Sequence, residues 1–277
     1  MEQIAFDKRE MRTSAGSRAS TLTVALCCGV AIGILGGLIG LGGAEFRLPL
    51  LIALFGFVAL PAVILNKAMS LVVVASALIF RTKAVPLMEV AGQWAIVVNL
   101  LAGSLVGAWF GAGWATRMKS RTLYRVLSAL LVFVGLVLIF GHQSHASHAL
   151  LAGWTQIVAG VIAGFGIGVF AALMGVAGGE LLIPTLILLF GVNIKLAGSL
   201  SLAVSLPTMI VGFMRYSQDS SFVVLRQNWV FVIVMAVGSL VGAGIGGQLL
   251  RIVPTEVLLP ILAAILLVSA VKVWQHQ

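Results

Sequence analysis

Two acidic residues, Glu45 and Glu180, each stand directly after a glycine-rich stretch in a sequence that is otherwise apolar. An ionised carboxylate is costly in hydrocarbon, so an acid within a membrane segment indicates a functional site. One interpretation is that one or both carboxyl groups take up and release protons that drive the movement of a substrate. The other is that each carboxylate caps the helix it precedes, near the positive end of the helix dipole.

The glycine-rich stretches themselves predict an anion site. Glycine at this density interrupts a helix, and the helix that follows then begins with unpaired N–H groups and a positive dipole end. Two such ends that meet near the midplane of the membrane would hold one small oxyanion. The residues predicted to bind it are Gly40, Gly42, Gly43, Ala44, Gly175, Gly178 and Gly179. The alternative is that the glycines serve helix packing.

A proline follows each break, Pro49 in the first and Pro184 in the second. Proline suits the start of a helix, where its missing N–H is not needed. We therefore predict that these residues mark two broken helices, with each proline near the start of the short segment that follows its break.

Arg47 has no counterpart in the second break, where Leu182 takes its place. It could contact the anion, pair with Glu45, or extend toward the membrane interface. Lys67 could also contact the anion, but we expect it to be a loop cation. Ser70 and Ser201 are predicted to line the substrate pathway, although serines in membrane helices also bond to their own backbone.

The composition indicates that membrane-spanning helices position these residues. The chain has 277 residues, of which 61% are hydrophobic and 9% charged, against about 25% charged in soluble domains. A membrane span needs roughly 20 apolar residues. We predict an all-α polytopic membrane protein with a polar cytoplasmic tail at 1–20 and about ten helical segments, at residues 21–43, 48–64, 66–80, 91–113, 124–141, 150–176, 181–194, 196–214, 228–250 and 255–274.

An internal repeat divides these segments into two halves, 21–141 and 150–274. The offset that carries Glu45 onto Glu180 also carries residues 103–108 onto 238–243, which are identical throughout. A small gap is needed around residues 57–93, where Ser70 matches Ser201 at a slightly smaller offset. We interpret the halves as a duplication with two transmembrane repeats.

The cations orient the chain, because lysine and arginine gather on the cytoplasmic side. Five crossings in each half would place twelve cations on one side and five, Arg47 among them, on the other. The first side, with both termini, is then cytoplasmic, and the protein lies in the inner cell membrane. An odd number of crossings in each half also means that the two repeats are inverted.

The two glycine clusters, each followed by a proline, resemble those of the TauE/SafE sulfite-exporter family, also called the toluenesulfonate uptake permease family. The resemblance covers both halves. It implies a permease for sulfite, sulfonates or other small organic anions, working as a secondary transporter by alternating access around the breaks. An anion channel or a non-transporting membrane partner is the alternative.

The sequence lacks the motifs that other classes of function require. No glycine-lysine phosphate-binding motif appears, so ATP hydrolysis is excluded. Cys27 and Cys28 are adjacent and fit no metal motif, and no nucleophile with its base lies in the spans. The net charge of +9 is spread between apolar runs and forms no nucleic-acid face. We expect no enzyme activity, no metal and no cofactor; the partners are a small anion, the lipid bilayer and, on one interpretation, protons. The oligomeric state stays open.

Overall fold

The computed structural model describes residues 2–39, 43–81, 87–140, 151–249 and 255–275, and over these residues the chain is helical with no strand. This confirms the predicted all-α class. The described part contains twelve α-helices and a short 3-10 turn, η2 (Ser220–Phe222). The helices are α1 (Glu2–Ile39), α2 (Ala44–Ala53), α3 (Ala59–Arg81), α4 (Leu87–Gly92), α5 (Trp94–Arg117), α6 (Ser120–Phe140), α7 (Trp154–Met174), α8 (Gly179–Phe190), α9 (Ile194–Tyr216), α10 (Val223–Gln227), α11 (Trp229–Leu249) and α12 (Thr255–Gln275).

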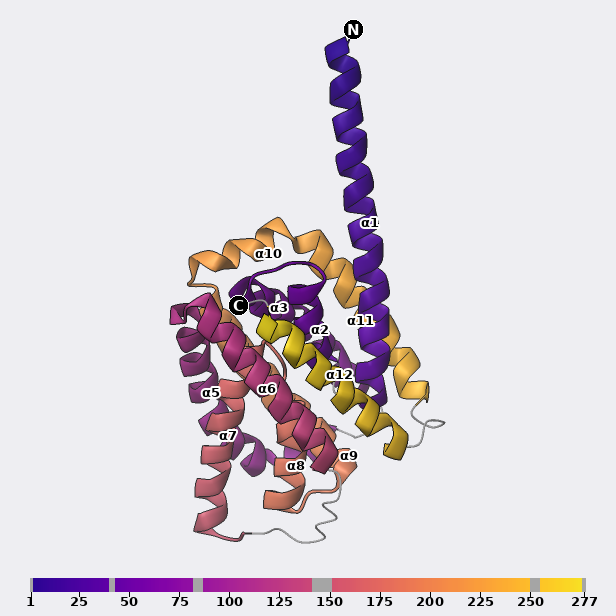
Figure 1. The fold of residues 1–277 in the computed structure, drawn as a ribbon. Helices are drawn as coiled ribbons and strands as arrows, with labels where there is room; N and C mark the ends of the chain where they lie inside the picture. Colours follow the sequence, from indigo (N-terminus) through magenta and orange to yellow (C-terminus); the bar gives the residue numbers. More distant parts are fainter. Residues whose placement is uncertain (1, 40–42, 82–86, 141–150, 250–254, 276–277) are drawn as a thin grey trace.

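Seven of these helices, among the described residues, are long and apolar enough to cross a membrane, which confirms a multi-pass membrane protein. They are α1, α3, α5, α6, α7, α9 and α11. Helix α1 also extends back to Glu2, so the segment predicted as a polar tail continues the first span, and α1 projects beyond the rest of the bundle (Figure 1).

Helices α2 and α8 are much shorter, with 10 and 12 residues. At about 1.5 Å per residue, neither can cross a hydrocarbon core of about 30 Å. This corrects the expectation of five full-length crossings in each half, because one of the five segments in each half is a short helix. The predicted segment 48–64 fails because it joins the end of α2, the turn at 54–58 and the start of α3. Hydropathy alone does not separate these pieces, since all three are apolar.

The helix bounds repeat along the chain at one constant offset, the one that carries Glu45 onto Glu180. Helices α3 and α9 are separated by this offset at both ends, and so are α6 and α12. The starts of α5 and α11 are separated by the same offset. No gap is therefore needed between residues 57 and 93. The counterpart of Ser70 is Ser205, which corrects the predicted match to Ser201.

Helices of the first half pack against helices of the second. Helix α1 of the first half packs against α11 of the second, and α7 packs against α5. Glycines let these pairs approach closely: a Cβ atom at Gly33 would collide with the Ser239 carbonyl, and one at Gly103 with the Val161 carbonyl. The six identical residues of each half, 103–108 and 238–243, lie in these contacts. Their identity therefore reflects packing.

The short helices lie inside the bundle, where the site must be. Eight of the ten residues of α2 are buried. Helix α2 packs against α3 and α12, and α8 packs against α9 and α7. Helices α6 and α12 lie side by side across the bundle (Figure 1). The apolar core thus surrounds two short helices that carry acidic residues.

Candidate functional site

The two acidic residues occupy equivalent places and meet in the interior. Glu45 is the second residue of α2, and Glu180 is the second residue of α8. Both side chains are buried. The carboxyl group of Glu180 lies close enough to that of Glu45 for the two to interact, and it also lies near its own backbone N–H. The two halves of the chain therefore each contribute one carboxyl group to a buried pair.

The residue before each short helix is a glycine in the left-handed conformation. Gly43 has a φ of 71° and Gly178 has a φ of 78°, and neither helix has a side-chain cap. A β-carbon is strained at this φ, so glycine fits both positions. Without a capping side chain, N–H groups in the first turn remain available at both helix starts. This is the geometry that an anion site between helix ends requires.

The prolines lie deeper in the short helices than the sequence predicted. Pro49 and Pro184 are each the sixth residue of their helix. In the second turn the missing N–H does matter, because it would have bonded to the carbonyl four residues earlier. Those carbonyls belong to Glu45 and Glu180. The prolines therefore do not start the helices; they remove a helical bond from the main chain of each acidic residue.

Arg47 is the cation of this centre. Its side chain is completely buried, which excludes the interpretation that it extends to the membrane interface. Arg47 lies close enough to Glu45 to be attracted by it. None of its three guanidinium nitrogens has a hydrogen-bond partner among the described residues. A buried guanidinium with no partner is expensive, so its donors are suited to a ligand.

Lys67 has a different role from the one predicted. It lies inside α3, completely buried, rather than in a loop. Its Nζ donates hydrogen bonds to the carbonyl oxygens of Ala171, at 2.9 Å, and Val176, at 3.3 Å. Both carbonyls belong to the end of α7 and the break after it. Lys67 therefore satisfies main-chain acceptors at the end of α7 and in the break after it.

Three more polar side chains bind the same break, and sequence reasoning assigned none of them this role. Asn66 Nδ2 donates to the carbonyls of Ala44 and Met174, at 3.1 Å each. Tyr216 donates to Ala172 O at 2.9 Å, and Ser205 donates to Ala177 O at 2.8 Å. A helix end buried without such donors would be unstable. The Asn66–Lys67 pair inside an apolar run was the available signal.

Of the remaining predicted residues, some belong to the buried centre and others serve helix packing or bond to their own helix. Ser70 is buried in α3, and its hydroxyl has no partner among the described residues. Ser201 bonds to Gly198 O of its own helix. Ala44 and Gly179 begin the two short helices. Gly175 ends α7 and packs against the backbone of α3 at Val63, so helix packing accounts for it. Gly40 and Gly42 lie outside the described residues.

The buried polar atoms that lack partners concentrate on four helices, α2, α3, α8 and α9. On these helices, the atoms without a partner belong to Glu45, Arg47, Asn66, Ser70, Glu180 and Ser199. Buried polar groups in folded proteins are normally hydrogen-bonded, so a cluster of exceptions indicates a place that a ligand or water completes. Two acids, one free guanidinium and two uncapped helix starts can hold an oxyanion, provided that the carboxyl groups are protonated.

Comparison with known proteins identifies the family from most of the chain. Residues 24–273 match the model of the family described as sulfite exporter TauE/SafE. The match includes both breaks and every helix that contributes to the buried centre. Neither a search of curated proteins nor a search of solved structures found a match.

Proposed function

Since the chain belongs to the TauE/SafE sulfite exporter family, whose members are membrane transporters of sulfur anions and not enzymes, we propose that it moves sulfite or a small sulfonate by alternating access around the α2–α8 centre. A small carboxylate is the other substrate considered. The observation that carries the proposal is the environment of the Arg47 side chain. Its guanidinium is wholly buried, without a hydrogen-bond partner among the described residues, and it belongs to the first turn of α2.

The substrate would be bound by donors from both halves. The planar guanidinium of Arg47 offers paired N–H groups that match the oxygens of a sulfur oxyanion. The first-turn N–H groups of α2 and α8, beginning after Gly43 and Gly178, would complete the shell. Ser70 would add a hydroxyl. Each of these groups is buried in the structure, so access from either side requires a rearrangement.

Glu45 and Glu180 would couple this movement to protons. An anion can enter beside two carboxyl groups only when their charge is reduced, because like charges repel at short range in a buried site. Protonation would therefore favour binding of the anion, and release of the anion would favour loss of the proton. The capping interpretation has weaker geometry at Glu180: the carboxyl group lies near its own N–H, but neither oxygen forms a hydrogen bond with a described residue.

The two repeats would be inverted and both termini cytoplasmic. Two features support this arrangement. The packing pairs α1–α11 and α5–α7 exchange equivalent helices, as a two-fold axis requires. In Figure 1 the first half begins at the α10 end of the bundle and finishes at the opposite end, whereas the second half does the reverse. The α10 end carries exposed Arg117, Lys119, Arg121 and Arg226, as a cytoplasmic face would.

Reconstitution into proteoliposomes tests the proposal. Sulfite, sulfonates, sulfate and dicarboxylates would be offered as substrates, with the pH gradient varied. We expect saturable sulfite or sulfonate flux that accelerates when substrate is present on the far side. Flux without saturation or trans-stimulation would indicate a channel instead. If none of the anions is transported or bound, the proposal fails.

A further inference from the structure

A cleft lies away from the buried centre, on the side of the bundle between α5 and α7. Its volume is about 610 Å³. Trp109, Phe110 and Trp114 of α5 line it together with Phe165 of α7, and all four side chains are exposed. In a membrane helix such a face meets lipid. Aromatic side chains of this kind are typical of the level of the lipid headgroups.

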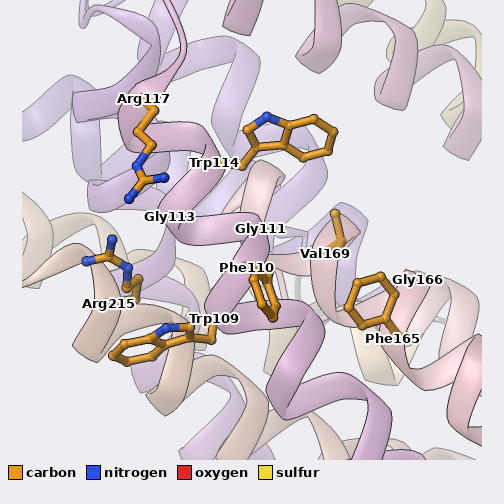
Figure 2. Close-up of a pocket in the computed structure, with 10 residues that line it drawn as sticks. All are labelled: Trp109, Phe110, Gly111, Gly113, Trp114, Arg117, Phe165, Gly166, Val169 and Arg215. Atoms are coloured by element: carbon orange, nitrogen blue, oxygen red, sulfur yellow. The ribbon is translucent and has the colours of Figure 1, made fainter.

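Two arginines close one edge of this cleft. Arg117 is the last residue of α5, and Arg215 is the last but one of α9. Figure 2 shows their guanidinium groups directed toward one another, on the side of the cleft away from Phe165 and Val169. Arg215 lies 5.4 Å from the ring centre of Trp109 and donates to Gln218 at 2.8 Å. Arg117 makes no hydrogen bond or ion pair with any described residue. The cleft is therefore apolar along its length and cationic at its end.

Because the two halves correspond at a constant offset, the residues of the cleft can be compared with those at the equivalent positions of the other half. At the constant offset between the halves, Trp109 and Trp114 correspond to Gly244 and Leu249. Arg117 corresponds to Ile252 and Arg215 to Phe80. The equivalent positions of the other half keep packing glycines but hold neither the tryptophans nor the arginines. Duplication of a scaffold does not explain the cleft, so its residues require a reason of their own.

We propose that this cleft binds an anionic phospholipid, with an acyl chain along α5 and α7 and the phosphate between Arg117 and Arg215. Charge complementarity selects the occupant. Two adjacent guanidinium groups at the end of an apolar surface match a negative headgroup attached to a hydrocarbon chain. The site spans three helices, because Arg215 comes from α9. A bound lipid therefore fastens α9 to α5 beside Tyr216, which bonds to the end of α7.

Native mass spectrometry of the full chain, purified in detergent, tests this site. Dioleoyl-phosphatidylglycerol and dioleoyl-phosphatidylcholine would be added in parallel, since they share acyl chains and differ in charge. We expect about a 25-fold preference for phosphatidylglycerol, because each of the two arginines near a membrane surface contributes roughly a fivefold factor. Equal retention of the two lipids would overturn the proposal.

Two kinds of variant test the two parts of the cleft. Arg117→Gln with Arg215→Gln should remove the preference, and Arg226→Gln, an exposed cation on α10, should leave it unchanged. Gly166→Leu should weaken retention of both lipids by about tenfold, because a β-carbon at Gly166 enters open space in the cleft and meets no atom within 4 Å. Gly244→Leu, on α11, is the matched control, since that glycine is equally open.

Three results would contradict the assignment. Retention that survives both Gly166→Leu and the arginine substitutions would place the lipid elsewhere. Displacement by inorganic phosphate at equal concentration would show that no acyl chain is needed. A dimer that forms with loss of the lipid and is broken by Gly166→Leu would assign the cleft to a second copy of the chain. All of these readouts measure binding, so they are independent of whether the protein transports sulfite.

Discussion

The two halves of the molecule share their carboxyl groups and differ in their cations. Glu45 and Glu180 correspond at the constant offset between the halves, as do Pro49 and Pro184. Among the described residues both buried cations, Arg47 and Lys67, belong to the first half, and the second half has Leu182 and Leu202 at the equivalent places. The two halves therefore carry acidic residues at equivalent positions, whereas the buried positive charge is on one side only.

The two cations of the first half also differ from each other, and this difference separates structure from function. Lys67 donates to two main-chain carbonyls of the second half. Arg47 has no hydrogen-bond partner among the described residues. The first is used in holding the halves together, and the second is available to a substrate. Substitutions that make the first half resemble the second test these two roles separately.

The largest effect on stability is expected from Lys67→Leu, which copies Leu202. The carbonyl of Val176 would lose its side-chain donor, and that of Ala171 would keep only main-chain donors, among them the N–H of Val176. Because both lost bonds come from a charged donor, the free energy of unfolding should fall by about 3 kcal/mol. Thermal unfolding in detergent, followed by tryptophan fluorescence, measures this. Leu202→Met, a substitution of similar volume, is the control and should cost less than about 1.5 kcal/mol. Unchanged stability of Lys67→Leu would contradict the structural role.

Arg47→Leu should act on transport and spare the fold. Loss of a charge-assisted hydrogen bond lowers substrate affinity by about 10- to 100-fold. Stability should stay equal or rise, because an unpaired buried charge is removed. Proteoliposome flux and thermal unfolding would be measured together.

The combined variant Arg47→Leu with Leu182→Arg moves the guanidinium to the second half. If the centre is shared between the halves, this variant should recover part of the lost flux. A loss of stability in Arg47→Leu as large as that of Lys67→Leu would show that Arg47 is structural.

Substitution of the two carboxyl groups should reduce proton coupling in steps, because Glu45 and Glu180 occupy equivalent places in the centre. Glu45→Gln and Glu180→Gln should each reduce the dependence of flux on an imposed pH gradient by several-fold, and the double variant should abolish it. Flux would be followed with the gradient in both directions. Full dependence on the gradient in the double variant would rule out proton coupling by these residues and favour the capping role.

The smallest effect is expected from Tyr216→Phe. It removes the hydroxyl that donates to Ala172 O, a carbonyl that also accepts from the N–H of Gly175. The free energy of unfolding should therefore fall by about 1 kcal/mol, with transport unchanged. Thermal unfolding and flux would be compared with the wild type. A large loss of flux would place Tyr216 in the substrate pathway.

The sequence was sufficient for the class of fold, the two breaks and the family, because composition and glycine clustering are local signals. It was not sufficient for the length of the short helices, since the turn at 54–58 is as apolar as the helices beside it. Lys67 was interpreted as a loop cation because two consecutive polar residues, Asn66 and Lys67, interrupt an apolar run. Their partners at the end of α7 and in the break after it belong to the other half of the chain, and no local pattern indicates a contact at that separation.

The alignment of the two halves was also hard to predict from local sequence. Low-complexity sequence allowed Ser70 to align with Ser201, but the helix bounds align it with Ser205. Helix ends are set by capping and by neighbours, so they preserve register where residue identities have diverged. The two acidic residues were singled out readily, because their type is rare in an apolar chain, whereas the serines were matched less well, because their type is common.

The hydrogen bonds of Asn66 and Lys67 have a mechanical consequence. Three of them join the middle of α3 to the end of α7 and the break that follows it. Any motion that separates α3 from the end of α7 must break all three in a place that water does not reach. This junction would therefore resist the separation of α3 from the end of α7 during any opening of the centre.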